Sequence, residues 1–437
     1  MFTTLSKLCT AAFVLTMFWT QTIGPLAIGV SGRLVPADFF GAGAIVFWIC
    51  DSFQGRIRIP VFLQAFACLV LALLLGCVTS LEQSQTLIEI LILCFLAVLC
   101  LAIVNTFTGL IDLLNLMSLL AAGLIVASAV GAWELFGPGL GLGSIVRDSP
   151  TAEVGIGGFR NSGQAGAYCL IVLTVLIPLR FSRLYGQLEL WRRYLVTCSV
   201  VMGLLFLVST VKIAAYIGLA VALGLYLVLS LVNRRWRNWI AVALVVACVG
   251  VAYEGLIRFQ LKWNGWLEYK AETRSAELGG EGFLADNLSA AVQAFNDRPL
   301  FGTGIGAFEG HYGEYEVHST YFKMLGEAGM TGLACYCLFM ACFMRMFWQL
   351  GRVEGVHANF LRQMIPFVIG CLVSWGYTYH LRKREFWIMI SVIWLARRLA
   401  GRQPGLGRSP MRVQFHKAGR NAVQGLGRPC HPVVSET

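Results

Sequence analysis

The chain has 437 residues, of which 57% are hydrophobic and only 13% are charged. Soluble domains carry about 25% charged residues, so this composition excludes an ordinary soluble protein. The formal net charge is +11.

Apolar stretches of about 20 residues, each long enough to cross about 30 Å of hydrocarbon, recur along most of the chain. They predict an all-α polytopic membrane protein of about twelve transmembrane helices. The first stretch follows Lys7 and lacks a small-residue cleavage site, which is typical of a retained helix rather than a signal peptide. The predicted spans are approximately 8–30, 36–52, 59–79, 86–105, 113–136, 163–181, 192–209, 212–232, 238–257, 318–348, 361–380 and 385–400.

The placement of Lys and Arg predicts the orientation of these spans. With both termini in the cytoplasm, most basic loops fall on the cytoplasmic side, and loop 258–317, where acids outnumber bases, falls on the periplasmic side. The loop His380–Arg384 is the exception, and it indicates either a miscounted helix or a functional cluster. The net charge therefore follows from topology and does not require a nucleic-acid partner.

Residues 1–400 are predicted to form one transmembrane domain, and residues 401–437 a disordered basic cytoplasmic tail. The large periplasmic loop, residues 258–317, is expected to be partly helical. Asp286 can cap a helix whose apolar stripe contains Leu288, Val292 and Phe295. Aromatic residues earlier in this loop suit either anchoring at the membrane interface or stacking on sugars.

Three cations stand alone on the predicted periplasmic side: Arg160, just before span six, Lys212, at the start of span eight, and His318, at the start of span ten. A cation at a helix N-terminus is opposed by the helix dipole unless an anion is present. A phosphate there would gain from the exposed backbone N–H groups and from the side chain. The alternatives are a loop charge for Arg160 and snorkelling to the interface for Lys212.

His318 titrates near neutral pH, as a general base must. Its alternative is an interface or helix-capping histidine. Glu327 lies nine residues into the same predicted helix, about 13 Å away by helical rise, which is too far for direct pairing. The predicted periplasmic side offers no acid pair or His/Cys cluster, so we expect neither a metal site nor a cofactor.

The glycines Gly302, Gly304 and Gly306 form GxGxG with no preceding strand, which excludes a dinucleotide-binding motif. A tight turn that returns the chain to the membrane is the simplest interpretation. A backbone nest that holds a phosphate is the alternative.

Three segments together resemble the O-antigen ligase and polymerase superfamily of bacterial membrane glycosyltransferases. They are the stretch around Arg160 (Phe-Arg-Asn-Ser-Gly-Gln), the turn Arg298–Phe308, and the helix start His318–Leu333 with its Gly-Glu-Ala-Gly sequence. The likeness covers about residues 155–350. It departs from the family at Lys212, where members usually have Arg, and at Ser319, where they usually have Asn after the His.

The resemblance implies metal-independent, inverting transfer of a saccharide from undecaprenyl pyrophosphate to a sugar hydroxyl at the periplasmic face of the bacterial inner membrane. His318 would be the catalytic base, and Arg160 and Lys212 would bind the pyrophosphate. Arg274 and Arg298 are reserve candidates. The implied partners are the lipid-linked glycan donor, a saccharide or lipid-core acceptor, membrane lipids and other polysaccharide-assembly proteins. The product would be O-antigen, capsule or exopolysaccharide. Ligase and polymerase are not distinguished, and polymerisation or export-linked assembly of an exopolysaccharide is slightly favoured.

Two other classes compete with this hypothesis. A secondary transporter or flippase of a lipid-linked saccharide or small anion would explain many helices and lone cations, but such proteins usually place charges or broken helices near the midplane. A purely structural partner in an envelope assembly complex is the third class.

Overall fold

The computed structural model describes residues 1–20, 27–28, 32–53, 57–136, 156–210, 212–232, 283–313, 316–348 and 355–401. The chain divides into two compact units, Met1–Gly401 and Arg402–Thr437, and the second lies outside the described residues. The tail prediction and Arg274 therefore fall outside them, as does the ninth predicted span, 238–257.

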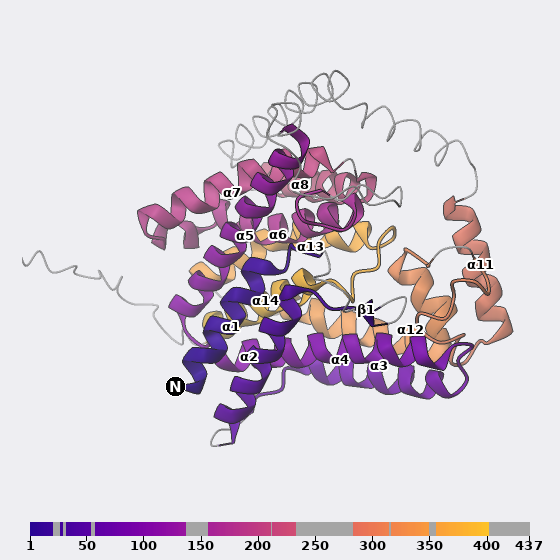
Figure 1. Cartoon of the computed structure of the whole chain (residues 1–437). Coiled ribbons are helices and arrows are strands. Elements are labelled where there is room, and N and C mark those ends of the chain that lie inside the picture. Colours follow the sequence, from indigo (N-terminus) through magenta and orange to yellow (C-terminus); the bar gives the residue numbers. More distant parts are fainter. Residues whose placement is uncertain are drawn as a thin grey trace, which may run out of the picture. The chain divides into compact units, whose positions relative to one another are not determined.

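The described part of the chain is helical apart from a short antiparallel pair, β1 (Ala27–Ile28) and β2 (Gly32–Arg33). The order of elements is shown in Figure 1. The helices are α1 (Phe2–Thr16), α2 (Pro36–Ser52), α3 (Val61–Val78), α4 (Gln83–Thr106), α5 (Leu110–Phe136), α6 (Ser162–Phe181), the 3-10 helix η2 (Arg183–Gln187), α7 (Leu190–Ser209), α8 (Ile213–Val232), α11 (Phe283–Asp297), α12 (Thr320–Trp348), α13 (Val356–Ser374) and α14 (Arg384–Gly401).

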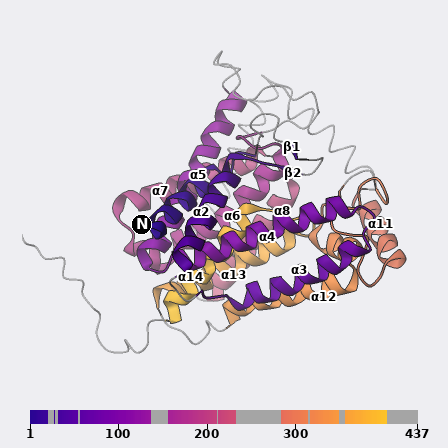
Figure 2. The same ribbon diagram turned by 60° about the horizontal axis from the view of Figure 1, so that its bottom comes forward.

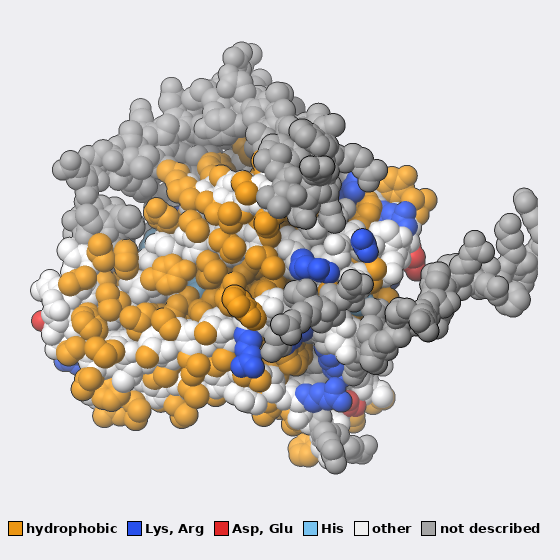
Figure 3. All heavy atoms as spheres, turned by 180° about the vertical axis from the view of Figure 1, so that it is seen from behind, with side chains coloured by type: hydrophobic (Ala, Val, Ile, Leu, Met, Phe, Trp, Pro, Cys, Tyr) orange, Lys and Arg blue, Asp and Glu red, His pale blue; other side chains and the backbone are white. Residues whose placement is uncertain are grey.

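Eight of these helices are long and apolar enough to cross a membrane: α3 to α8, α12 and α13. Their exposed surfaces carry large apolar side chains such as Leu71, Leu91 and Val228, which suit contact with lipid rather than water. Figure 3 shows one such apolar face, on which the visible Lys and Arg side chains gather toward one side. The protein is a multi-pass membrane protein, and the predicted count of twelve spans remains a prediction.

Two helices form the centre of the bundle. α6 and α14 are buried along nearly their whole length. α5, α7, α8, α13 and α14 pack against α6, while α3, α4 and α12 form a second group in which α3 packs on both α4 and α12 (Figure 2).

Polar contacts join the helix ends in two separate sets, as alternating topology requires. Ends predicted on the cytoplasmic side bond to one another, and so do ends predicted on the periplasmic side. The first set contains Lys7–Asp112 at 2.6 Å, Thr3–Asp51 at 2.8 Å and Arg192–Asn115 at 2.9 Å. The second contains Arg384–Asp38 at 2.7 Å, Arg382–Glu89 at 2.8 Å and Thr20–Gln164 at 2.9 Å.

The second set explains the exceptional basic loop His380–Arg384. Arg384 forms a two-pronged ion pair with Asp38, and Arg382 pairs with Glu89. Acidic partners thus neutralise the charges that opposed the predicted orientation, so a miscounted helix is not needed to explain them.

Two sequence predictions about helices were wrong. α1 ends at Thr16, not near residue 30, because the chain turns so that the Thr20 hydroxyl can contact Arg160 and Gln164. α11 begins at Phe283, so Asp286 lies within its first turn rather than capping it.

The predicted apolar stripe of α11 is also not its buried face. Leu288 and Val292 are each 40% exposed, whereas Ala291 and Ala294 are fully buried. A Cβ added to Gly326 of α12 would lie 3.0 Å from the Ala291 carbonyl oxygen, so the close approach of α11 to α12 requires small residues.

α12 contains a break at Gly329, whose φ of 63° and ψ of −165° are not helical. Residues 330–348 alone would reach about 28 Å at about 1.5 Å per residue, close to the thickness of the hydrocarbon layer. The first segment, residues 320–328, is therefore free to take another direction and to present its N-terminus to the functional site.

Replacing Gly329 with Ala is expected to destabilise the protein. The positive φ costs about 1–3 kcal/mol for other residues, and the new Cβ would lie 2.5 Å from the Gly302 nitrogen. Thermal unfolding of the detergent-solubilised protein measures the effect. Gly224→Ala is the control, since nothing lies within 4 Å of its added Cβ. Equal melting temperatures for the two variants would contradict this prediction.

Candidate functional site

Lys212 immediately precedes α8, and its carbonyl accepts the N–H of Ala215 at 3.0 Å. Its side chain lies along the first turn of α6. A Cβ on Gly163 would be 3.5 Å from Lys212 Nζ, and a Cβ on Gly166 would be 2.7 Å from Lys212 Cβ. These two glycines leave the space that the lysine side chain occupies, so its ammonium group reaches the N-terminus of α6.

The N-terminus of α6 is well defined. Asn161 caps the helix by accepting the N–H of Gln164 at 2.8 Å. Arg160 precedes this cap with an exposed side chain. Its guanidinium group has no acidic partner in the part of the chain that the structure describes, and its backbone N–H donates to the Thr20 hydroxyl at 2.7 Å.

The segment that carries Arg160 is bound by the carboxylate of Glu134. Gly157 and Gly158, both with positive φ, donate their N–H groups to Glu134 at the end of α5. Thr20 N–H donates to the Gly158 carbonyl at 3.0 Å. The loop is therefore fixed on both sides, and Arg160 is presented from a rigid turn.

His318 lies two residues before α12 and keeps an exposed side chain between buried neighbours. Its Nδ1 lies 2.8 Å from the carbonyl oxygen of Glu316. Because a carbonyl only accepts, this bond places the hydrogen on Nδ1 and leaves Nε2 of the neutral ring as a proton acceptor. That tautomer is the one a general base at Nε2 needs.

The surroundings favour the neutral imidazole. Removal of water by nearby protein atoms is the largest effect and lowers the pKa of His318 below its ordinary value. The bond to the Glu316 carbonyl opposes this, and the positive charge of Lys212 lowers the pKa further.

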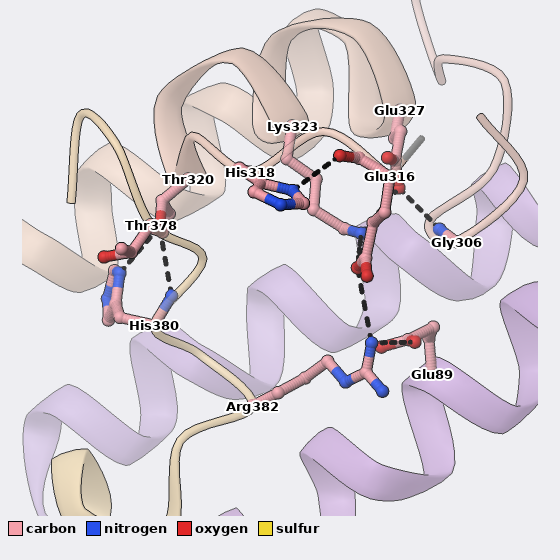
Figure 4. Close-up of polar contacts among 10 residues, drawn as sticks. All are labelled: Glu89, Gly306, Glu316, His318, Thr320, Lys323, Glu327, Thr378, His380 and Arg382. Carbon is pink, nitrogen blue, oxygen red and sulfur yellow. Dashed lines mark hydrogen bonds and ion pairs between the residues drawn. The ribbon is translucent and has the colours of Figure 1, made fainter. Parts of the chain in front are cut away.

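A network of charged residues lies beneath His318 (Figure 4). Lys323, which is fully buried, donates to Glu316 at 2.5 Å and lies 3.4 Å from Glu327. Arg382 from the α13–α14 loop contacts Glu316 at 3.3 Å and Glu89 of α4 at 2.8 Å. Burial tends to raise the pKa of Glu316, but the charges of Lys323 and Arg382 prevail and lower it to about 2, so this carboxylate stays ionised.

The glycine turn packs against the break in α12. Thr303 and Gly304 donate their N–H groups to the carbonyls of Gly326 and Glu327, and Gly306 N–H donates to the Glu327 carboxylate. The three glycines of the turn, Gly302, Gly304 and Gly306, have positive φ. A phosphate nest would need these same backbone N–H groups, but here they donate to α12 at its break. This favours the prediction of a tight turn over that of a phosphate nest.

The structure brings part of the predicted site together. Lys212 contacts the first turn of α6 and interacts electrostatically with His318, while Arg160 lies three residues before Gly163 at the same helix end. Arg298 instead donates to the Thr79 carbonyl at the end of α3, which holds the glycine turn.

Sequence reasoning missed Glu316 and Arg382. Glu316 lies two residues before His318 in the sequence, but nothing marked it among the acids of a long loop. Arg382 lay within the basic loop recognised as exceptional, which was the available signal. Glu327 was excluded from direct pairing with His318, and it joins the network through Lys323 instead.

Among the described ranges, no group of three or more His, Cys, Asp or Glu side chains could hold a metal ion. The basic and backbone groups around Lys212 suit an anion. Three helices, α6, α8 and α12, begin beside the candidate residues, and the positive ends of their dipoles add to this preference.

Comparison with known proteins identifies one stretch of the chain. Residues 198–337 match the family model described as O-Antigen ligase. No curated protein matches the chain. The matched stretch contains Lys212, the glycine turn and His318, and it covers 140 of the 437 residues, so the likeness to the O-antigen ligase family is shown for this part of the chain.

Proposed function

We propose that the protein transfers or polymerises saccharide from undecaprenyl pyrophosphate onto a sugar hydroxyl at the periplasmic face of the bacterial inner membrane. The observation that carries this proposal is the position of Lys212, whose ammonium group reaches the N-terminus of α6. With His318 as a neutral base, the site would offer both an anion-binding corner and a proton acceptor.

The pyrophosphate would lie at the start of α6, bound by Lys212 and by first-turn N–H groups, with Arg160 closing the site. Charge develops on this group as the bond to the anomeric carbon breaks, and positioned cations and N–H groups stabilise it. Lys212 supplies one positive charge without the two-pronged geometry of an arginine.

The acceptor hydroxyl would attack the anomeric carbon from the face opposite the leaving group. Its oxygen forms the new glycosidic bond, and its proton passes to His318 Nε2. The bond to the phosphate oxygen breaks with its electron pair, so undecaprenyl pyrophosphate leaves and the anomeric configuration is inverted. No step requires a metal ion.

Purified protein with undecaprenyl-pyrophosphate oligosaccharide tests this function. We expect release of undecaprenyl pyrophosphate together with a longer or transferred glycan. Release that is unchanged in both His318→Ala and Arg160→Ala would refute the assigned site. Two acceptors, a second lipid-linked repeat and a lipid-core saccharide, distinguish polymerase from ligase. We expect transfer to the lipid-linked repeat.

The transport alternative gains one feature from the structure, because α12 is broken as many transporter helices are. The carbonyls of Gly326 and Glu327, however, accept N–H groups of the glycine turn. These two carbonyls are therefore already bonded within the protein and are not vacant for an ion. Passage of intact lipid-linked saccharide across liposomes without bond cleavage would support transport instead.

A further inference from the structure

The segment that carries His318 is attached to the α13–α14 loop. Thr320 N–H donates to the Trp375 carbonyl at 3.0 Å, and the Thr320 hydroxyl donates to the Thr378 carbonyl at 2.8 Å. His380 N–H donates to the same hydroxyl at 3.2 Å, and the His380 ring stacks on Trp375 at 3.6 Å. These contacts fix the start of α12 immediately after His318.

The segment just before His318 is held by ion pairs instead of backbone hydrogen bonds. Glu316 is the residue whose carbonyl holds the His318 ring, and its carboxylate contacts both Lys323 and Arg382. Lys323 is completely buried, where an ammonium group is stable only with close anionic partners. The ring of Tyr379 lies 4.6 Å from this ammonium group and adds a cation–π contact.

Arg382 extends the support to a third element. Its Nη1 lies 2.8 Å from Glu89 Oε1, whose residue is 1% exposed within α4. The ion pairs therefore join α4, the start of α12 and the α13–α14 loop. Both Glu89 and Arg382 lie outside the stretch that matches the family model, residues 198–337.

We propose that Glu316 is a positioning residue for His318: Lys323 and Arg382 hold its side chain, so that its carbonyl keeps the hydrogen of the imidazole on Nδ1 and Nε2 facing the acceptor. This inference rests on the proposed function. It assigns to the buried charge network, and to the α13–α14 loop in particular, a role in catalysis beyond folding.

The same geometry makes an electrostatic prediction. Among the residues that the structure describes, Lys212 from the start of α8, and Glu316 and Lys323 from the segment of His318 itself, influence the charge of its imidazole. After desolvation by nearby protein atoms, the Glu316 bond and charge raise the pKa of His318, whereas both lysines lower it. Since Glu316 itself stays ionised above pH about 2, its charge is constant over the range in which His318 titrates.

The test is the pH dependence of donor cleavage in Glu316→Gln. We expect kcat to fall about 10- to 100-fold, as when a group that orients a metal-bound histidine is removed. The KM for the lipid-pyrophosphate donor should not change, because Lys212 and α6 are untouched. The acid limb of the pH profile should move to lower pH, because a negative charge that favours the imidazolium is lost.

Arg384→Gln is the matched control. It removes an arginine two residues after Arg382, at the start of α14, and breaks an ion pair with Asp38, but Arg384 does not contact Glu316. It should reduce at most the yield of folded protein and leave the acid limb in place. A Glu316→Gln acid limb that does not move, or that moves to higher pH, would overturn the positioning role.

A second pair of variants covers the case in which Glu316→Gln folds too poorly to assay. Arg382→Gln should lower kcat, and Arg382→Lys should restore most of it because it keeps the positive charge. Equal losses in both, or no loss in either, would overturn the proposal. Failure of the proposed function looks different, since the unmodified protein would then release no undecaprenyl pyrophosphate from the lipid-linked donor.

Discussion

Replacing His318 with Ala should lower kcat for saccharide transfer by about 10²- to 10⁴-fold, the usual contribution of a general base. The reason is that Nε2 is the unprotonated nitrogen of a ring whose Nδ1–H is bonded to Glu316. Single-turnover cleavage of lipid-linked oligosaccharide measures the effect. Donor binding should persist, because the cationic groups at the start of α6 remain.

The role of His318 as the base also predicts how the rate of transfer depends on pH. The base must be neutral, so the rate should be highest above its pKa and fall as pH falls through it. Because desolvation by nearby protein atoms and the charge of Lys212 lower this pKa from 6.5, the acid limb should lie below pH 6.5. A His318→Ala variant with the wild-type rate, or a wild-type acid limb well above pH 6.5, would contradict the assignment.

Replacing Lys212 with Gln should lower kcat by about 10²- to 10³-fold, the cost seen when one group that stabilises transition-state charge is removed. The side chain reaches the first turn of α6, where the leaving pyrophosphate would lie. Lys212→Arg keeps the charge and should retain most of the activity, so it is the control for packing beside Gly166.

The same substitution should shift the pH profile. The positive charge of Lys212 lowers the pKa of His318, so its removal should move the acid limb to higher pH. This shift is opposite to the one expected for Glu316→Gln. If Lys212→Gln and Lys212→Arg lost equal activity, the lysine would act through packing rather than through charge.

The sequence predicted most of the helices because their signal is local. Continuous apolar stretches gave the bounds of α2, and those of α3 to α8 to within a few residues. The prediction failed at α1 and α11, where tertiary contacts decide. The Thr20 hydroxyl accepts the Arg160 N–H, and Gly326 leaves room for the close approach of Ala291. Neither contact produces a periodic pattern in the sequence.

The candidate site was predictable only in part. Lys212 stood out because no other charged residue lies between Arg193 and Arg234, whereas Arg160 and His318 stood out because each lies just before an apolar helix. Glu316 and Arg382 did not, because their role depends on pairing between segments 66 residues apart. The break at Gly329 was equally hidden, since only contact with the glycine turn shows why a helix should stop there.

A structure of the protein with undecaprenyl pyrophosphate bound tests the central claim most directly. We expect the pyrophosphate within hydrogen-bonding distance of Lys212 Nζ and of the first-turn N–H groups of α6, with His318 Nε2 facing the position of the anomeric carbon. A headgroup bound away from Lys212, or at the opposite ends of these helices, would contradict it.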